Sequence, residues 1–162
     1  MTAKDAIRHV IEFCDGLLRQ YISDLNDRDL LVRSVPGTNH IAWQLGHLIA
    51  SDHKMLAALG VPVPPLPDGF AESHSKEAAT SDDPAKFWTK GEYVRLLDTQ
   101  KAAALAALER TSESQLDQPG PEPMRAYAPT VGAVFTLLGT HKLMHAGQFV
   151  PIRRKLGKAP LF

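Results

Sequence analysis

The sequence has a single cysteine, no net charge and no long hydrophobic run. Cys14 cannot form a disulfide within the chain, because it has no partner. The chain has 18 basic residues (lysine and arginine) and 18 acidic residues (aspartate and glutamate). It therefore has no excess of positive charge that would attract nucleic acid or an anionic membrane. No stretch approaches the roughly 20 apolar residues of a membrane span. We therefore expect neither a nucleic-acid nor a membrane partner.

The first residues also lack the uninterrupted apolar core of a signal peptide. The stretch MTAKDAIRHVIEFCDG carries Asp5, Arg8 and Glu12 among its apolar residues. A lone cysteine on an apolar stripe is more typical of a small buried thiol than of a reactive one. It also fits a reducing compartment. We expect a cytoplasmic protein.

No useful length of the sequence alternates between apolar and polar residues, which is the pattern of a half-buried strand. The apolar residues recur instead at the spacing of a helix. Four segments carry this spacing, at residues 3–24, 38–60, 89–110 and 130–156. Thr38 and Thr130 are expected N-caps, and Thr89 with Glu92 forms a capping box. A chain of 162 residues is of ordinary size for one domain. We predict an all-α four-helix bundle with residues 1–162 as a single domain.

Two histidines stand four positions apart in HKLMHAGQ, residues 141–148, inside the last predicted helix. Residues at this spacing are neighbours on one helix face, so His141 and His145 can coordinate one metal ion without distortion of the backbone. They could equally be two core histidines, each hydrogen-bonded to its own neighbour. Gln148 lies seven positions after His141 and faces the same side.

A metal would need a third ligand from another helix, and His47 in WQLGHLIAS is the best candidate. It shares a flank of the second helix with His40, Gln44 and Ser51, which could line a pocket. Gly46 beside it would allow a close approach of another helix, and Gly147 suggests the same for the last helix.

Several common catalytic patterns are absent. Lys142 occupies the position of the catalytic glutamate of an HExxH motif, and we find no Ser-His-Asp pattern, phosphate-binding glycine loop or CxxC pair. The catalytic residues therefore stay unassigned. Asp52 lies in the apolar stripe of the second helix, where an arginine or a helix cap could satisfy it, or where it could support a ligand histidine.

Two stretches together resemble a known family. NHIAWQLGHL at residues 39–48 and HKLMHAGQFVPIRRKLGKAP at residues 141–160 look like the DinB-like (DinB/YfiT-like) superfamily, and the resemblance spans nearly the whole chain. It implies a four-helix bundle with an unusual long connection, often as a homodimer. It also implies a divalent metal (Zn, Ni or Fe) held by three histidines, which are His47, His141 and His145 in this sequence.

The resemblance also guides the expected activity. Its characterised members include thiol-dependent transferases and isomerases that use mycothiol or bacillithiol, and hydrolases assigned as metal-dependent. We expect the metal to activate water or a low-molecular-weight thiol for attack on a small-molecule substrate, with His40 and Gln148 contacting the thiol or substrate. The alternative is a non-catalytic, stress-related homodimeric bundle whose metal site is structural or vestigial. Trp43 and Ile49 extend the apolar surface of the second helix, which favours a homodimer that buries part of it.

Overall fold

The computed structural model describes residues 1–161 as a bundle of four long helices. The long helices are α1 (Ala3–Ile22), α2 (Ile41–Ala58), α4 (Lys90–Arg110) and α6 (Val131–Lys155). The short helices α3 (Phe70–Ser73) and α5 (Glu113–Leu116) lie in the connections, with 3-10 turns at Asp29–Leu31, Glu77–Thr80, Pro84–Lys86 and Glu122–Met124. None of the described residues forms a β-strand, so the predicted all-α four-helix bundle is confirmed.

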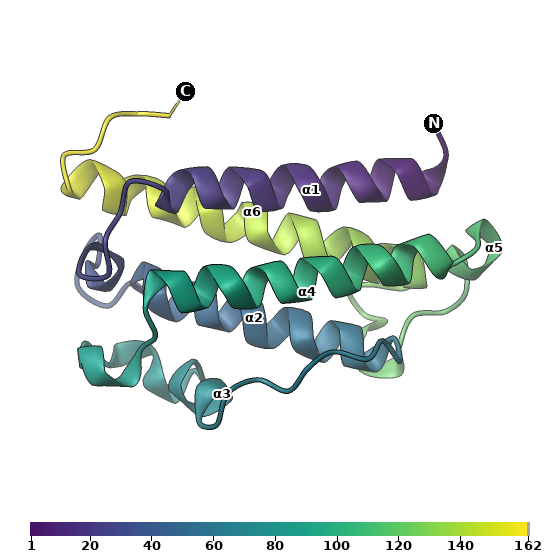
Figure 1. The fold of residues 1–162 in the computed structure, drawn as a ribbon, viewed down its shortest axis with the longest axis horizontal. Helices are drawn as coiled ribbons and strands as arrows, with labels where there is room; N and C mark the ends of the chain where they lie inside the picture. The colour runs from purple at the N-terminus through teal and green to yellow at the C-terminus, as the bar shows by residue number, and fades with distance from the viewer. Residues whose placement is uncertain (162) are drawn as a thin grey trace.

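The helices follow an order that differs from simple up-down-up-down. The N-terminal helix α1 packs most extensively on α6, and α2 packs on α4 and α6. In Figure 1, α1 and α6 run in the same direction, and α2 and α4 run in the opposite one. The parallel neighbours α2 and α4 therefore require a connection that returns along the length of the bundle, and residues 59–89 supply it.

Side chains at the helix starts satisfy the free backbone N–H groups. Thr2 and Thr89 form capping boxes, and the Thr130 side chain accepts a hydrogen bond from the Ala133 N–H. The expectation that Thr38 caps the second helix is wrong. The helix starts at Ile41, and His40 caps it instead.

The connection between α2 and α4 is held against α2 by buried polar contacts. The indole N–H of Trp43 donates to the carbonyl of Ser75 at 2.8 Å. The imidazole of His74 lies directly over Gly46, where an added Cβ would come within 1.9 Å of the ring. Gly46 thus makes room for a loop side chain and not for a neighbouring helix, which corrects the expectation from the sequence.

The apolar surface that suggested a homodimer is buried within the single chain. Only 5% of Trp43 and 0% of Ile49 remains exposed within the single chain. The expectation that these residues lie in a dimer interface is therefore wrong. The homodimer itself stays a prediction.

The core consists of two apolar clusters separated along the bundle by a buried polar layer. One cluster includes Leu18, Leu45, Leu97 and Phe149, and the other includes Ile11, Leu56, Leu108 and Phe135. Between the clusters each long helix contributes one buried polar side chain, and these are Asp15, Asp52, Gln100 and Lys142. Cys14 is buried beside this layer as expected, and burial raises the pKa of its thiol. Across residues 1–161, no helix has both the length and the apolar character of a membrane span.

Candidate metal centre

Three histidines from two helices meet at one point of the bundle. His47 comes from the middle of α2, and His141 and His145 come from successive turns of α6. One ring nitrogen of each lies within 4.8 Å of those of the other two, and no other such group occurs within residues 1–161. Tetrahedral zinc with Zn–N bonds of about 2.0–2.1 Å needs nitrogens roughly 3.4 Å apart. Small side-chain movements would bring the three imidazoles to that spacing, so the donor set fits a divalent ion.

Gln44 fixes the orientation and the tautomer of His145. Its side-chain N–H donates to the carbonyl of Asn39 at 2.9 Å, which turns its oxygen toward the histidine. The Nδ1–H of His145 then donates to that oxygen at 2.8 Å. This leaves the Nε2 lone pair of His145 available for a metal, the arrangement that metal-bound histidines commonly show.

Trp43 positions His47 on α2. Its indole stacks on the imidazole of His47 with the ring centroids 5.1 Å apart and the planes inclined by 8°. Because the Trp43 N–H is fixed by Ser75, the ring has a defined place against which His47 rests. His47 in turn faces His141 and His145 at centroid distances of 5.3 and 5.2 Å.

The electrostatics of the cluster favour neutral imidazoles. Burial lowers the pKa of His47, His141 and His145, and for His145 it does so to about 4. The other two histidines add to the effect on His145, because two protonated rings would repel each other. Metal ions bind the neutral imidazole, so near neutral pH the cluster is in the state that a metal requires.

A buried ion pair lies beside the three histidines. Lys142, which directly follows His141, is 2% exposed and donates to the carboxylate of Asp52, which is 1% exposed. Lys142 also donates to the carbonyl of Leu138 at 3.1 Å. Burial raises the pKa of Asp52 although the ammonium group opposes that rise. The partner of Asp52 is thus a lysine of the histidine motif, and neither the arginine nor the helix cap expected from the sequence.

The other predicted site residues are His40 and Gln148. His40 is fully buried at the start of α2, where its Nδ1 accepts from the Trp43 N–H at 3.0 Å and its Nε2–H donates to the Ser81 carbonyl at 3.1 Å. Gln148 is exposed on α6. A contact of either residue with a thiol or substrate stays a prediction.

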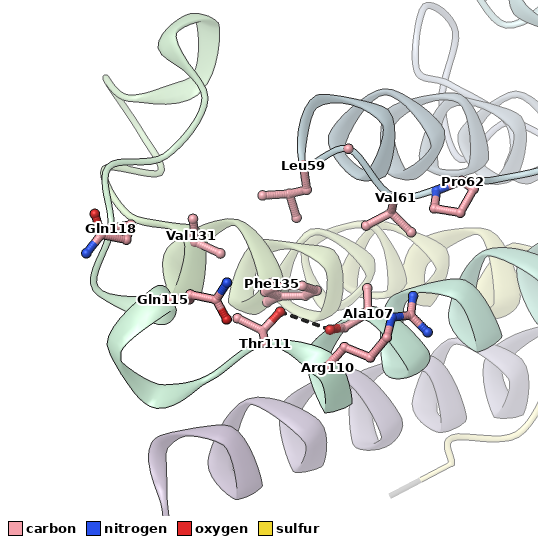
Figure 2. A pocket seen from close by; sticks show the side chains of 11 residues that line it. Leu59, Val61, Pro62, Ala107, Arg110, Thr111, Gln115, Gln118, Val131 and Phe135 are labelled. Atoms are coloured by element: carbon pink, nitrogen blue, oxygen red, sulfur yellow. Dashed lines mark hydrogen bonds between the residues drawn. The ribbon is translucent and has the colours of Figure 1, made fainter.

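A cavity of about 290 Å³ opens beside two of the three histidines. It is lined by His47, Ser51, Lys54, Met55, Met124, Tyr127, Leu137 and His141. A larger cavity of about 780 Å³ lies where α2 and α4 end and α6 begins, and Figure 2 shows its lining with Phe135 near the centre. None of the three histidines lines that larger cavity. Of these two cavities, only the smaller one reaches the histidine cluster.

Several supporting residues were not identified as such from the sequence. The sequence predicts Gln44 only as a pocket residue and Trp43 only as apolar surface, and no motif points to Lys54 or Tyr127. Gln44 and Trp43 stand three and four positions before His47, so their helical spacing was the available signal for both.

We expect the replacement Gln44→Leu to weaken metal binding about 10- to 100-fold, because the orienting hydrogen bond to His145 is lost. Gln148→Leu is the matched control, since this exposed glutamine lies on the helix that carries His145. Competition with a coloured zinc chelator measures both affinities. Equal affinities in the two variants would contradict the role given to Gln44.

Together, the bundle and the site define a helical protein with a three-histidine cluster that could hold a metal ion. The chain belongs to the DinB superfamily, whose family model matches residues 3–149. No curated protein matches the chain significantly.

Two solved structures share the fold. A conserved protein from Enterococcus faecalis superposes with a TM-score of 0.72 at 15% identity, covering 98% of this chain and 99% of that one. YfiT from Bacillus subtilis superposes with a TM-score of 0.66 at 19% identity, covering 96% of this chain and 89% of that one. YfiT is described as a probable metal-dependent hydrolase with an unusual four-helix bundle topology.

Proposed function

We propose that this protein is a metal-dependent enzyme, a hydrolase or a thiol-dependent transferase, in which His47, His141 and His145 hold one divalent ion. The observation that carries the proposal is the convergence of three neutral imidazoles next to a cavity. When bound, the ion would lower the pKa of a water or a thiol so that the nucleophile exists at neutral pH. Imidazole ligands suit zinc, nickel and iron alike.

The surrounding residues would each serve this chemistry. Gln44 holds His145 with one nitrogen free, and the stacked indole of Trp43 holds His47 in place. The cavity would admit a small-molecule substrate or a low-molecular-weight thiol to the exposed side of His47 and His141. The description of YfiT as a probable metal-dependent hydrolase supports the hydrolase class. The unpaired, buried Cys14 supports a cytoplasmic location.

The proposal includes a homodimer, now through a different surface. Phe13 on α1 is 57% exposed, and Leu143 and Met144 on α6 are 41% and 59% exposed. The two helices are packed together, so a dimer formed through the outer side of α1 and α6 would bury these exposed apolar side chains.

The proposed ligands make a direct prediction of metal content. We expect the purified protein to carry one divalent ion per chain, and His47→Ala, His141→Ala and His145→Ala each to lower this content strongly. His9→Ala is the control, because His9 is exposed on α1. Elemental analysis after dialysis measures the ion. Wild-type metal content in all three ligand variants would refute the assignment.

The alternative is a bundle whose metal is only structural. Structural zinc sites usually have four protein ligands, whereas the cluster here has three among the described residues. The two apolar clusters also give the bundle a core of its own. Treatment with a chelator should therefore leave the far-UV circular dichroism signal largely unchanged while lowering the unfolding midpoint. Loss of the helical signal on chelation would favour the structural function instead.

A further inference from the structure

One face of α2 carries a metal ligand, a hydroxyl and an ammonium group in a row. His47, Ser51 and Lys54 stand at positions i, i+4 and i+7, which places them above one another on the same side of the helix. All three line the cavity beside the metal centre. The cavity therefore extends from the histidines along α2 as far as Lys54.

The remaining walls of the cavity are mostly apolar. Leu137 lies one turn before His141 on α6, and Met55 of α2 is almost fully buried at 4% exposure. Met124 and Tyr127 come from the connection that precedes α6, and the phenol of Tyr127 is the second hydroxyl in the lining. A ligand in this cavity would thus have an apolar middle between two polar ends.

The end of the cavity at Lys54 is cationic. Lys54 is exposed, and it makes no hydrogen bond or ion pair with any residue in the described part of the chain. Lys76 is a second cation close enough to His47 to act on it electrostatically, but it does not line the cavity. No acidic residue lines the cavity, and the buried carboxylate of Asp52 is bound by Lys142. The ammonium group of Lys54 therefore has no acidic partner in the cavity lining.

We propose that the cavity binds a small molecule that carries a carboxylate, with its reactive group at the three histidines and its carboxylate paired with Lys54. Ser51 and Tyr127 would donate hydrogen bonds to the same molecule. Seven residues of helix separate His47 from Lys54 by about 10 Å along the axis, which sets the approximate length of the ligand. The cavity lies near the lower end of ligand-pocket volumes, which begin at about 300 Å³, so the ligand is small.

The donor set favours a carboxylate over a phosphate. A single ammonium group with two hydroxyls provides one unit of charge, and no arginine lines this cavity. Phosphate sites more often use arginine forks or several cations, because the group carries more charge and more acceptor oxygens. The assignment deepens the proposed function and rests on it, since the reactive end of the ligand lies at the metal.

The test uses the full-length, zinc-loaded protein and two probes of equal length. Both probes carry a hydroxamate, which binds zinc, and a short alkyl chain that ends in either a carboxylate or a carboxamide. We expect calorimetry to show the carboxylate probe binding about tenfold more tightly, as for one charge-assisted hydrogen bond. Lys54→Gln should abolish this preference without changing the affinity for the carboxamide probe, and Lys54→Arg should retain it. Lys76→Gln, which removes a nearby charge outside the lining, should retain most of it.

The outcomes separate this inference from the proposed function. A preference for the carboxylate probe that survives Lys54→Gln, or equal binding of both probes to the wild type, would overturn the inference alone. Failure of the protein to take up zinc would overturn the metal centre and the inference with it, whereas failure of both probes to bind the zinc-loaded protein would overturn the inference alone. A phosphonate-ended probe that binds more tightly than the carboxylate, through Lys54, would replace the assigned ligand class.

Discussion

We expect the replacement Asp52→Ala to lower the free energy of unfolding by about 3 to 5 kcal/mol, because it leaves a buried ammonium group without its counter-ion. Lys142 is 2% exposed, and apart from Asp52 its recorded acceptor is the carbonyl of Leu138. The variant must therefore bury an unpaired charge or deprotonate the lysine, and both cost free energy.

The reverse change should cost less. In Lys142→Met the carboxylate of Asp52 can take up a proton, and burial already raises its pKa. The double variant Asp52→Leu with Lys142→Met removes both charges and should come close to the wild-type stability, since apolar pairs of similar volume often replace buried ion pairs without loss.

Urea unfolding of the metal-free proteins, followed by circular dichroism, measures these differences. Asp82→Ala is the control, because this carboxylate pairs with Arg33 but is 68% exposed, and exposed pairs contribute about 0 to 1 kcal/mol. A loss in Asp52→Ala no larger than that in Asp82→Ala would show that the buried pair has little effect on stability.

The architecture was predictable because it depends on local patterns. The helical spacing of apolar residues and the capping box at Thr89 act within a few residues, and a sequence displays them directly. The pair His141 and His145 was visible for the same reason. His47 was a candidate from its helix position and was selected by the resemblance to a family, and the structure brings it together with His141 and His145.

The supporting contacts were not predictable, because they join residues far apart in the chain. Gln44 and His145 are separated by 101 positions, and Asp52 and Lys142 by 90. The periodicity of apolar residues shows which face of a helix is buried. It does not show which residue of another helix contacts that face. The errors at Thr38 and Gly46 have a related cause. A histidine can cap a helix as a threonine does, and a glycine can make room for a loop as well as for a helix.

We expect the replacement Gly46→Ala to cost about 3 kcal/mol of stability, because its methyl group would overlap the imidazole of His74 and displace a ring with two buried hydrogen bonds. The added Cβ would come within 1.9 Å of the ring. The ring cannot move freely, since Nδ1–H donates to the Phe70 carbonyl at 2.7 Å and Nε2 accepts from the Tyr93 hydroxyl at 2.8 Å. Its displacement would loosen the connection that covers α2 beside His47.

Gly147→Ala is the matched control for this change. Gly147 is also helical, but nothing lies within 4 Å of an added Cβ, which corrects the expectation that it serves close packing. Alanine should stabilise that position by about 0.5 to 1 kcal/mol, because glycine loses more backbone entropy in a helix. The size of the clash itself follows from a double-mutant cycle with His74→Ala. In that background the ring is gone, so Gly46→Ala should cost little or stabilise the protein. An equal cost of Gly46→Ala with and without the His74 ring would show that the glycine is needed for some other reason than the space it leaves for the imidazole.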